Sequence, residues 1–310
     1  MSNLTYRQLG KTGLRVSPLG IGGGSGISSE DLLYAFDHGI NYFFFSSDLH
    51  HCEYQKSAAA LRSLCGANSR VRDSVVLATV SYVTHPEKLP GILMDQFTEL
   101  NIDYIDVFHW GWINDDDDLL PLIKQARQIQ GDCRLTRTIR RIQEQRLQYQ
   151  EQAQEQVQLI NEELLKRGLV RFVGASFHSR AQARRWMRNL DVLMLRYNIA
   201  HTGLHEDIVP FLNAQKQTNP GIVVFNTGHP ALFQSPGRAA SATLQQRLPS
   251  VADCYRFALF QPWVDLVLTG PASRVEIDQA LKAVALGPLE EEEQAELLRY
   301  GAQYERRPVA

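Results

Sequence analysis

Short, almost purely apolar segments recur along this chain and alternate with longer segments whose apolar residues repeat at helical spacing. An apolar run without polar alternation predicts a strand buried on both faces, as in a parallel sheet covered by helices. The expected strands are residues 16–21, 42–45, 75–79, 104–109, 171–175, 192–195, 222–225 and 266–269. Amphipathic segments such as 30–38, 55–64 and 87–100 predict helices between them.

Eight strand–helix units of this kind favour a (β/α)8 barrel, the α/β fold known as the TIM barrel, over an open doubly wound sheet. An open sheet that binds nucleotides would carry a Gly-x-Gly-x-x-Gly turn after its first strand, and the glycines of residues 20–26 do not have this spacing. With 310 residues, of which 44% are hydrophobic, the chain is long enough for one barrel domain spanning 1–310. Residues 6–16 are expected to precede the first barrel strand as a hairpin across the barrel bottom.

A long helical insertion is expected after the fourth strand, over residues 119–167. It is rich in Gln, Glu and Arg and carries only a thin apolar stripe, which is typical of a solvated extension or helical hairpin. Three interpretations are open: an insertion without a role, a lid, or a contact in a homo-oligomer. The four aspartates 115–118 just before it favour a solvated helix start over a cation site.

Charge and composition narrow the classes of partner. A net charge of −2 and a pI near 6.5 provide no general attraction for nucleic acid or an anionic membrane, so a small-molecule substrate is expected. No apolar run approaches the ~20 residues that span a bilayer, and the N-terminus lacks a signal-peptide pattern, so a cytoplasmic location is expected. No metal site is expected either, because no Cys-x-x-Cys pair occurs among Cys52, Cys65, Cys133 and Cys254.

Several segments carry a family resemblance. Residues 6–22 read Tyr-Arg-Gln-Leu-Gly-Lys-Thr-Gly-Leu-Arg-Val-Ser-Pro-Leu-Gly-Ile-Gly, which resembles the opening of the aldo-keto reductases. Residues 103–107, 168–176, 197–198 and 267–270 follow in the order and spacing of that family. The resemblance implies NADPH-dependent carbonyl reduction by a tetrad, in which a Tyr donates the proton, a Lys lowers the pKa of that Tyr, and an Asp and a His complete the site.

The tetrad of that family does not carry over onto this chain. The family's Asp corresponds to Phe44 or Phe45, and its Tyr corresponds to Leu49 or His50. In each case the choice depends on whether one inserted residue is allowed. Its Lys falls on Val80, an uncharged residue that cannot shift the pKa of a phenol. Its His would lie near Gly111, where His109 is the nearest candidate. We therefore expect chemistry that differs from that of the family.

The family's cofactor positions are also partly replaced. Ser176 matches the Ser that binds the nicotinamide carboxamide. The family's Asn, Gln and stacking aromatic residue are replaced here by Phe177, Met194 and Asn226. The segment that holds the adenosine phosphates in the family is matched by Gly270, Ser273 and Arg274. The resemblance therefore implies that NADP(H) binds weakly or not at all.

Ionisable side chains cluster after strand 42–45, at the end where such a barrel places its chemistry. We expect His50 and His109 to be the catalytic pair, with Asp48 orienting one ring. Two imidazoles facing one pocket would repel if both were charged, so their pKa values should separate and leave an acid and a base near neutral pH. The other expected pocket residues are Phe45, His51, Trp110, His178 and Asn226. No spacing signature supports a metal bound by His50, His109 and His178.

Three functions follow from these observations. The first is an atypical small-molecule enzyme that performs elimination, isomerisation or cyclisation by acid–base chemistry. The second is an NADP(H)-dependent oxidoreductase of unusual mechanism, in which His50 replaces the Tyr. The third is a catalytically inactive binding protein that uses residues 119–167 as its contact surface. The fold alone does not distinguish them.

Overall fold

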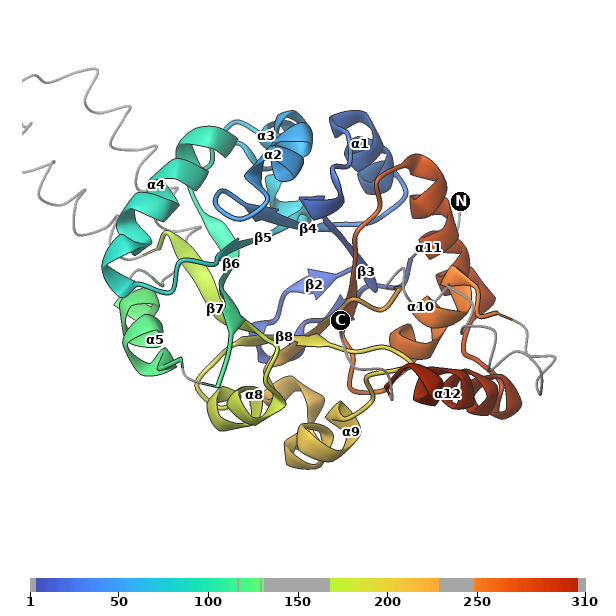
Figure 1. The fold of residues 1–310 in the computed structure, drawn as a ribbon. Helices are drawn as coiled ribbons and strands as arrows, with labels where there is room; N and C mark the ends of the chain where they lie inside the picture. Colours follow the sequence, from blue (N-terminus) through green and yellow to red (C-terminus); the bar gives the residue numbers. More distant parts are fainter. Residues whose placement is uncertain (1–3, 116, 129, 131–167, 229–247, 306–310) are drawn as a thin grey trace, which may run out of the picture.

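Eight parallel strands close into a barrel in the computed structural model, which describes residues 4–115, 117–128, 130, 168–228 and 248–305 (Figure 1). Around the barrel the strands follow the order β10-β3-β4-β5-β6-β7-β8-β9. Their bounds are β3 Leu19–Gly22, β4 Tyr42–Ser46, β5 Val76–Ser81, β6 Ile105–Ile113, β7 Val170–Phe177, β8 Val192–Arg196, β9 Gly221–Phe225 and β10 Leu266–Thr269. This closed sheet confirms the predicted (β/α)8 barrel.

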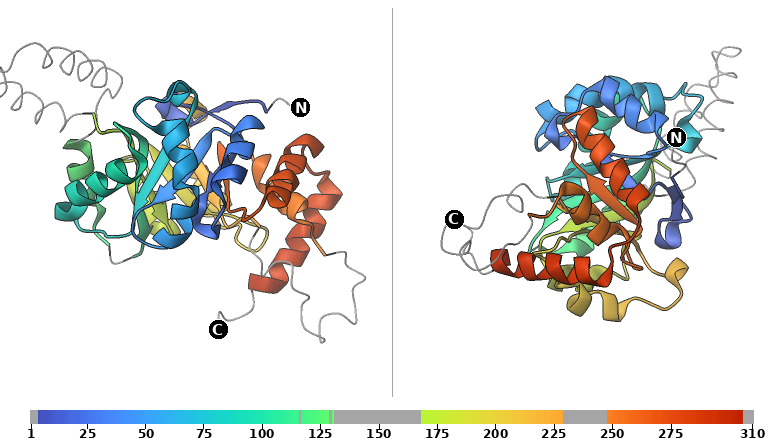
Figure 2. Two further views of the ribbon diagram at one scale, coloured as in Figure 1. Left: turned by 90° about the horizontal axis from the view of Figure 1, so that it is seen from above. Right: turned by 90° about the vertical axis from the view of Figure 1, so that its right-hand side faces the viewer.

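Helices surround the barrel, as Figure 1 and Figure 2 show. Their bounds are α1 Ser29–Asp37, α2 His51–Tyr54, α3 Ala58–Cys65, α4 Leu89–Leu100, α5 Leu119–Gln128, α8 Arg180–Trp186, α9 Leu204–Asp207, α10 Val251–Leu259, α11 Arg274–Leu286 and α12 Glu291–Glu305. Local sequence explains where some of them start: the Ser28 hydroxyl accepts a bond from the Asp31 N–H at α1, and Ser250 and Asp253 form a capping box at α10. None of the described helices is both long and apolar enough to cross a membrane.

An N-terminal hairpin lies across the barrel bottom, at the N-terminal ends of the strands. It pairs β1 (Arg7–Gln8) with β2 (Arg15–Val16). Between these strands the Gly10 N–H donates to the Asp265 carboxylate, 3.1 Å away and directly before β10. The same carboxylate accepts a bond from the Ile222 N–H in β9. The predicted hairpin at the barrel bottom is therefore confirmed.

Several strand ends differ from the expected ones. The first barrel strand begins at Leu19 rather than at Val16, because Pro18 has no N–H to donate to a strand ladder. The strands β6 and β7 run to Ile113 and Phe177, beyond the expected ends at residues 109 and 175. Gly111 in β6 and Ser176 in β7 interrupt the apolar runs, so the apolar pattern did not mark the residues around them as strand.

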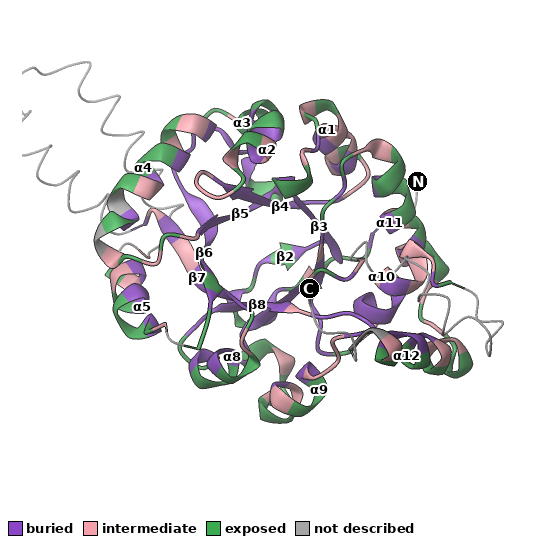
Figure 3. Cartoon of the chain, viewed as in Figure 1, coloured by how far each residue is buried: buried purple, intermediate pink, exposed green. Residues whose placement is uncertain are grey.

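The strand register decides which side chains face the barrel interior. Residues paired across neighbouring parallel strands point to the same face, and successive residues alternate. The rings of Phe44 and His109 are 5.8 Å apart, although β5 lies between their strands, so both side chains project inward. From this pair the register assigns to the inward face Gly22, Ser46, Val80, Gly174, Ser176, Met194, Arg196 and Phe225. Figure 3 shows that the strands are largely buried, whereas the exposed residues lie mainly on the helices.

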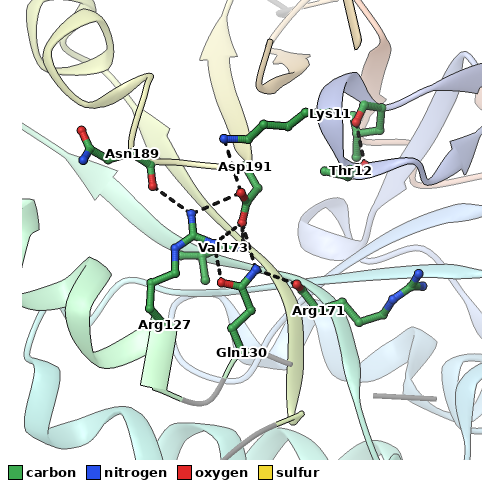
Figure 4. A network of polar contacts seen from close by, with 9 residues as sticks. Lys11, Thr12, Arg127, Gln130, Arg171, Val173, Asn189 and Asp191 are labelled. Atoms are coloured by element: carbon green, nitrogen blue, oxygen red, sulfur yellow. Dashed lines mark hydrogen bonds and ion pairs between the residues drawn. The ribbon is translucent and has the colours of Figure 1, made fainter. Parts of the chain in front are cut away.

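A polar network at the barrel bottom is centred on Asp191, directly before β8 (Figure 4). Its carboxylate accepts bonds from the Arg127 guanidinium of α5 at 2.5 Å and from the Val173 N–H of β7 at 3.0 Å. The ammonium group of Lys11, in the hairpin, lies 3.5 Å from the same carboxylate. The network thus joins the hairpin, α5, β7 and β8.

The expected helical insertion is described only in its first part, where α5 covers Leu119–Gln128. Residues 131–167, which include Cys133 and the expected lid or oligomer contact, lie outside the described residues. Gln130 forms a bridge with Val170, the first residue of β7. The two described ends of this segment therefore meet near the N-terminal end of β7, away from the barrel mouth.

Candidate active site at the barrel mouth

Asp48 joins the loops that follow β4 and β5 at the C-terminal end of the barrel. One carboxylate oxygen accepts bonds from the Ser46 hydroxyl at 2.7 Å and from the Leu49 N–H at 2.6 Å. The other oxygen accepts bonds from the Ser81 hydroxyl at 2.9 Å and from the Tyr82 N–H at 2.8 Å. Asp48 was expected to orient a histidine, but within the described residues its bonds go to these loop groups.

The two histidines after β4 lie in different surroundings. His50 is exposed at the start of α2, where its φ of 58° lies in the left-handed region, and its side chain makes no hydrogen bond, ion pair or aromatic contact with a described residue. The His51 ring turns towards the helix layer, where its Nε2 lies 2.8 Å from a carboxylate oxygen of Glu99 in α4. His51, expected in the pocket, is thus engaged outside the barrel.

His109 lies inside the barrel and is fully buried. Its Nδ1 donates to the Thr79 carbonyl oxygen at 3.3 Å, and its Nε2 has no partner among the described residues. Burial lowers the pKa of His109 to about 4, so the imidazole is neutral at neutral pH. No described contact joins His109 to His50, the other member of the expected pair.

Strand alternation separates two of the expected pocket residues from the mouth. Trp110 follows the inward residue His109, and its indole N–H donates to the Leu122 carbonyl oxygen of α5 at 3.1 Å. Phe45 follows the inward residue Phe44, and its ring centroid lies 6.4 Å from that of His51, which pairs with Glu99 of α4. Both side chains therefore face the helix layer. The apolar pattern located these strand ends but did not reveal which of two successive residues points inward.

A row of aromatic side chains borders the mouth instead. The hydroxyl groups of Tyr54 and Tyr82 lie close enough to influence each other electrostatically. Ring centroids are 6.3 Å apart between Tyr82 and Trp112, 5.8 Å between Trp112 and His178, and 6.0 Å between His178 and Phe225. Burial raises the pKa of Tyr82 to about 12 and raises that of Tyr54 further. Both phenols can therefore form hydrogen bonds but are poor proton donors near neutral pH.

An irregularity at the end of β6 brings Trp112 into this row. The register with β7 shifts between Trp110 and Ile113, and Trp112 has a φ of 59°. The Trp112 N–H donates to the hydroxyl oxygen of Ser176 at 3.0 Å. Such bulges bend a strand and redirect a side chain, often beside an active site. Ser176, expected to bind a nicotinamide carboxamide, here supports the bulge and can still donate its own hydroxyl hydrogen.

Arg196 and His178 form the basic part of the mouth. Arg196 occupies the last inward position of β8, opposite Phe225, and makes no hydrogen bond or ion pair with a described residue. Partial burial lowers the pKa of His178 below its usual value, and the positive charge of Arg196 lowers it further. Arg196 was not among the residues expected at the mouth. Alternation through Val192 and Met194 would have marked it as an arginine in an otherwise apolar inward series.

A hollow of about 460 Å³ adjoins His178. Its other lining residues are Arg180, Ala181, Arg184 and Asp207. The Nε of Arg180 lies 2.5 Å from a carboxylate oxygen of Asp207, and the guanidinium of Arg184 stacks 3.7 Å above the ring of Phe211. The hollow is thus lined mainly by basic side chains, and its carboxylate is already paired.

The expected phosphate-binding segment is occupied by contacts within the chain. Arg274 of α11 lies 3.0 Å from a carboxylate oxygen of Glu30 and 3.2 Å from one of Asp31, and it stacks on Tyr34. The carboxylate of Glu276 accepts a bond from the Ala272 N–H before α11. These carboxylates place negative charge beside the segment that the family resemblance predicted to hold the adenosine phosphates.

Three further residues expected at the site are Ser273, Gly270 and Asn226. Ser273 is the N-cap of α11 but makes no capping bond with its side chain. A methyl group at Gly270 would lie 2.9 Å from the Ser25 hydroxyl oxygen, so the chain is closely packed there. Asn226 is exposed after β9, with a φ of 56°, and its carbonyl oxygen accepts a bond from the Asn198 amide. In the described part of the chain, no group of three or more His, Cys, Asp or Glu side chains could hold a metal ion.

No protein-family model and no curated protein sequence matches the chain. Solved structures do match it. The aldo-keto reductase AKR11C1 from Bacillus halodurans, in its holo form, aligns over 96% of each chain with a TM-score of 0.68 and 19% identity. An aldo-keto reductase from Klebsiella pneumoniae in complex with NADP and acetate aligns over 96% of each chain with a TM-score of 0.64 and 18% identity. The chain therefore has the fold of the aldo-keto reductases.

Proposed function

We propose that this protein is a small-molecule enzyme that performs acid–base chemistry, such as an elimination, isomerisation or cyclisation, at the barrel mouth. The observation that carries the proposal is His178 beside Arg196. Burial and the charge of Arg196 keep the imidazole neutral near neutral pH, so His178 can accept a proton. The guanidinium of Arg196 would stabilise the negative charge that develops when a base removes a proton.

The complementary proton donor in this proposal is His50, as the sequence pattern predicts. Its ring is exposed on the loop that Asp48 holds in place, and it has no competing partner in the described part of the chain. His109 has a different role, because its low pKa prevents it from acting as a cation near neutral pH. It supplies a neutral imidazole whose Nε2 remains available for a hydrogen bond.

We also propose that NADP(H) binds weakly or not at all, and that the family's tetrad is absent. Val80, at the family's Lys position, is fully buried. It is the register partner of His109 on the adjacent strand β5. Arg274, at the phosphate-binding position, is already paired with Glu30 and Asp31. A nucleotide phosphate would have to displace these carboxylates. The residues present therefore do not fit the cofactor well.

An NADP(H)-dependent oxidoreductase of unusual mechanism is the second candidate. The similar structure from Klebsiella pneumoniae contains NADP, and another aldo-keto reductase structure from that organism, with a TM-score of 0.64 and 19% identity, contains NADPH. Ser176 is also present at the position that contacts the carboxamide in the family. A protein with neither activity would correspond to the third candidate, an inactive binding protein.

A fluorescence titration with NADPH separates the first two candidates. We expect no change in nicotinamide emission with up to about 100 μM NADPH, because the phosphate-binding arginine is already paired. A matched titration with the Glu276→Gln variant tests whether the acidic first turn of α11 weakens binding. Micromolar binding of NADPH by the wild-type protein, coupled to reduction of a carbonyl compound, would replace the acid–base proposal with the oxidoreductase.

Acid–base chemistry can be sought before the substrate is known. Small carboxylic acids and ketones are incubated with the protein in D2O, and deuterium incorporation at carbon is followed by NMR. We expect exchange with at least one compound, and we expect His178→Gln to slow it by about 10²–10⁴, the usual effect of losing a proton-transfer group. His51→Gln serves as the control, because His51 is paired with Glu99 outside the barrel. Equal rates in the wild type and the His178 variant would remove His178 from the mechanism.

A further inference from the structure

Arg196 is a cation at the mouth without a counter-ion in the described part of the chain. Its Nε is buried and has no hydrogen-bond partner there. Desolvation alone lowers its pKa, and no neighbouring carboxylate opposes the effect. A guanidinium remains charged at neutral pH even so, and a buried donor without a partner is unfavourable. This side chain is therefore suited to bind an anion from outside the chain.

The described residues near Arg196 do not provide the missing anion. Residues 229–247, which follow β9 and lie outside the described residues, contain no Asp or Glu. Asp207, the carboxylate of the adjoining hollow, is already paired with Arg180 at 2.5 Å. The described residues that flank 131–167 meet at the N-terminal end of β7, away from the mouth. Among the described residues, the positive charge at the mouth is thus not balanced locally.

Flat side chains lie beside this charge. Phe225 is the register partner of Arg196 on β9, and its ring is 6.0 Å from that of His178. Trp112 follows at 5.8 Å from His178, and about half of its surface is exposed (50%). An exposed indole beside a partly buried phenyl ring offers a surface for a flat apolar group. The mouth therefore combines one positive charge with an aromatic wall.

We propose that Arg196 binds the carboxylate of a substrate whose body is flat and apolar, such as an aromatic or conjugated acid. The planar guanidinium matches a carboxylate with two parallel N–H···O bonds. A monoanion fits better than a phosphate dianion, because Arg196 is the one unpaired cation that the described residues place on the inward face. This inference rests on the proposed function, since it names the substrate class of the same site.

Isothermal titration calorimetry with phenylacetate and its neutral analogue phenylacetamide tests the inference. We expect the wild-type protein to bind the carboxylate at least about tenfold more tightly than the amide, since charge-assisted bonds are about twice as strong as neutral ones. Arg196→Met should abolish this preference, and Arg196→Lys should retain only part of it. Arg184→Met is the matched control: it removes a nearby cation that stacks on Phe211, and it should change the preference by less than about twofold.

Thermal unfolding and circular dichroism show whether each variant is folded. If Arg196→Met does not fold, Arg196→Gln, which keeps a polar side chain, takes its place. The inference is overturned if wild-type protein binds neither probe or binds both equally, or if the folded neutral variant keeps the preference. The assay needs neither turnover nor NADPH. If the protein reduced carbonyl compounds with NADPH, the acid–base proposal would be wrong. The calorimetry would still show whether Arg196 binds carboxylates.

Discussion

At the residue scale, His109 and Arg196 show how depth in the barrel decides the state of a basic side chain. Both side chains occupy inward positions of the barrel, His109 on β6 and Arg196 on β8. His109 lies deeper and is fully buried, and it loses its charge because neutralising an imidazole costs little. Arg196 is only partly buried and cannot lose its proton at physiological pH. The first is suited to packing and hydrogen bonding, and the second to binding an anion.

The buried imidazole of His109 makes stability depend on pH. Its pKa is about 4 in the folded protein and about 6.5 when unfolded, so between these values only the unfolded chain binds the proton. Stability is therefore complete above pH 6.5 and falls as the pH drops towards 4. At about 1.4 kcal/mol per pKa unit, the loss is about 3 kcal/mol.

Urea unfolding at several pH values between 4 and 8 measures this dependence. The His109→Gln variant should show a flatter profile over the range 4 to 6.5, although it is less stable at neutral pH. His50→Gln is the matched control, because His50 is exposed and has no partner among the described residues. A His109→Gln profile as steep as that of the wild type would show that other groups cause the acid sensitivity.

At the element scale, the mouth depends on connections between loops that are distant in sequence. Asp48 accepts four hydrogen bonds and fastens the loop after β4 to the loop after β5. The shift at the end of β6 depends in turn on a bond from Trp112 to Ser176 of β7. Asp48 thus positions the loop that carries His50, whether or not His50 transfers a proton.

Replacing Asp48 with Ala should destabilise the protein by about 1–3 kcal/mol, because four donors lose their acceptor and some of them are partly buried. Chemical denaturation measures the difference in the free energy of unfolding. Equal m-values for the variant and the wild type show that the two unfolding transitions can be compared. Asp37→Ala is the control: Asp37 is exposed at the end of α1, and the change should stay within about 0.5 kcal/mol. An Asp48 variant as stable as this control would mean that the loops do not need the carboxylate.

At the scale of the whole molecule, the N-terminal hairpin closes the barrel bottom by close backbone packing. Gly10 has a φ of 47°, and a methyl group there would lie 2.3 Å from the backbone nitrogen of Gly221 in β9. Gly13, in the same hairpin, has a φ of 73° and open space around it. The two glycines therefore separate the cost of close packing from the cost of a left-handed backbone.

We expect Gly10→Ala to cost at least about 3 kcal/mol, because both the backbone conformation and the contact with β9 are disturbed. Gly13→Ala should cost about 1 kcal/mol, which is the conformational penalty alone. Thermal unfolding of both variants provides the comparison. Equal losses would indicate that the hairpin moves away from the barrel bottom without energetic consequence.

The sequence by itself determined the fold, because the apolar strands and amphipathic helices that alternate along the chain leave few topologies that bury them all. It also indicated that ionisable and aromatic residues gather around the C-terminal ends of β4, β6 and β7, although β6 and β7 run further than expected. It could not determine the side-chain directions there. Trp110 and Phe45 belong to the correct strands but face the helices, since a shift of one residue reverses the face of a strand.

Only the tertiary structure decided which side chains meet at the mouth. Trp112 reaches the aromatic row through an irregularity in β6 that depends on the neighbouring strand. Arg196 is distinguished by its lack of a partner among the described residues, and that property depends on the surroundings of β8 rather than on its sequence. Arg274 fits a phosphate-binding pattern in the sequence, but in the fold α1 brings two carboxylates to it. Long-range packing decided each case, because it sets the distances and the burial that local patterns do not contain.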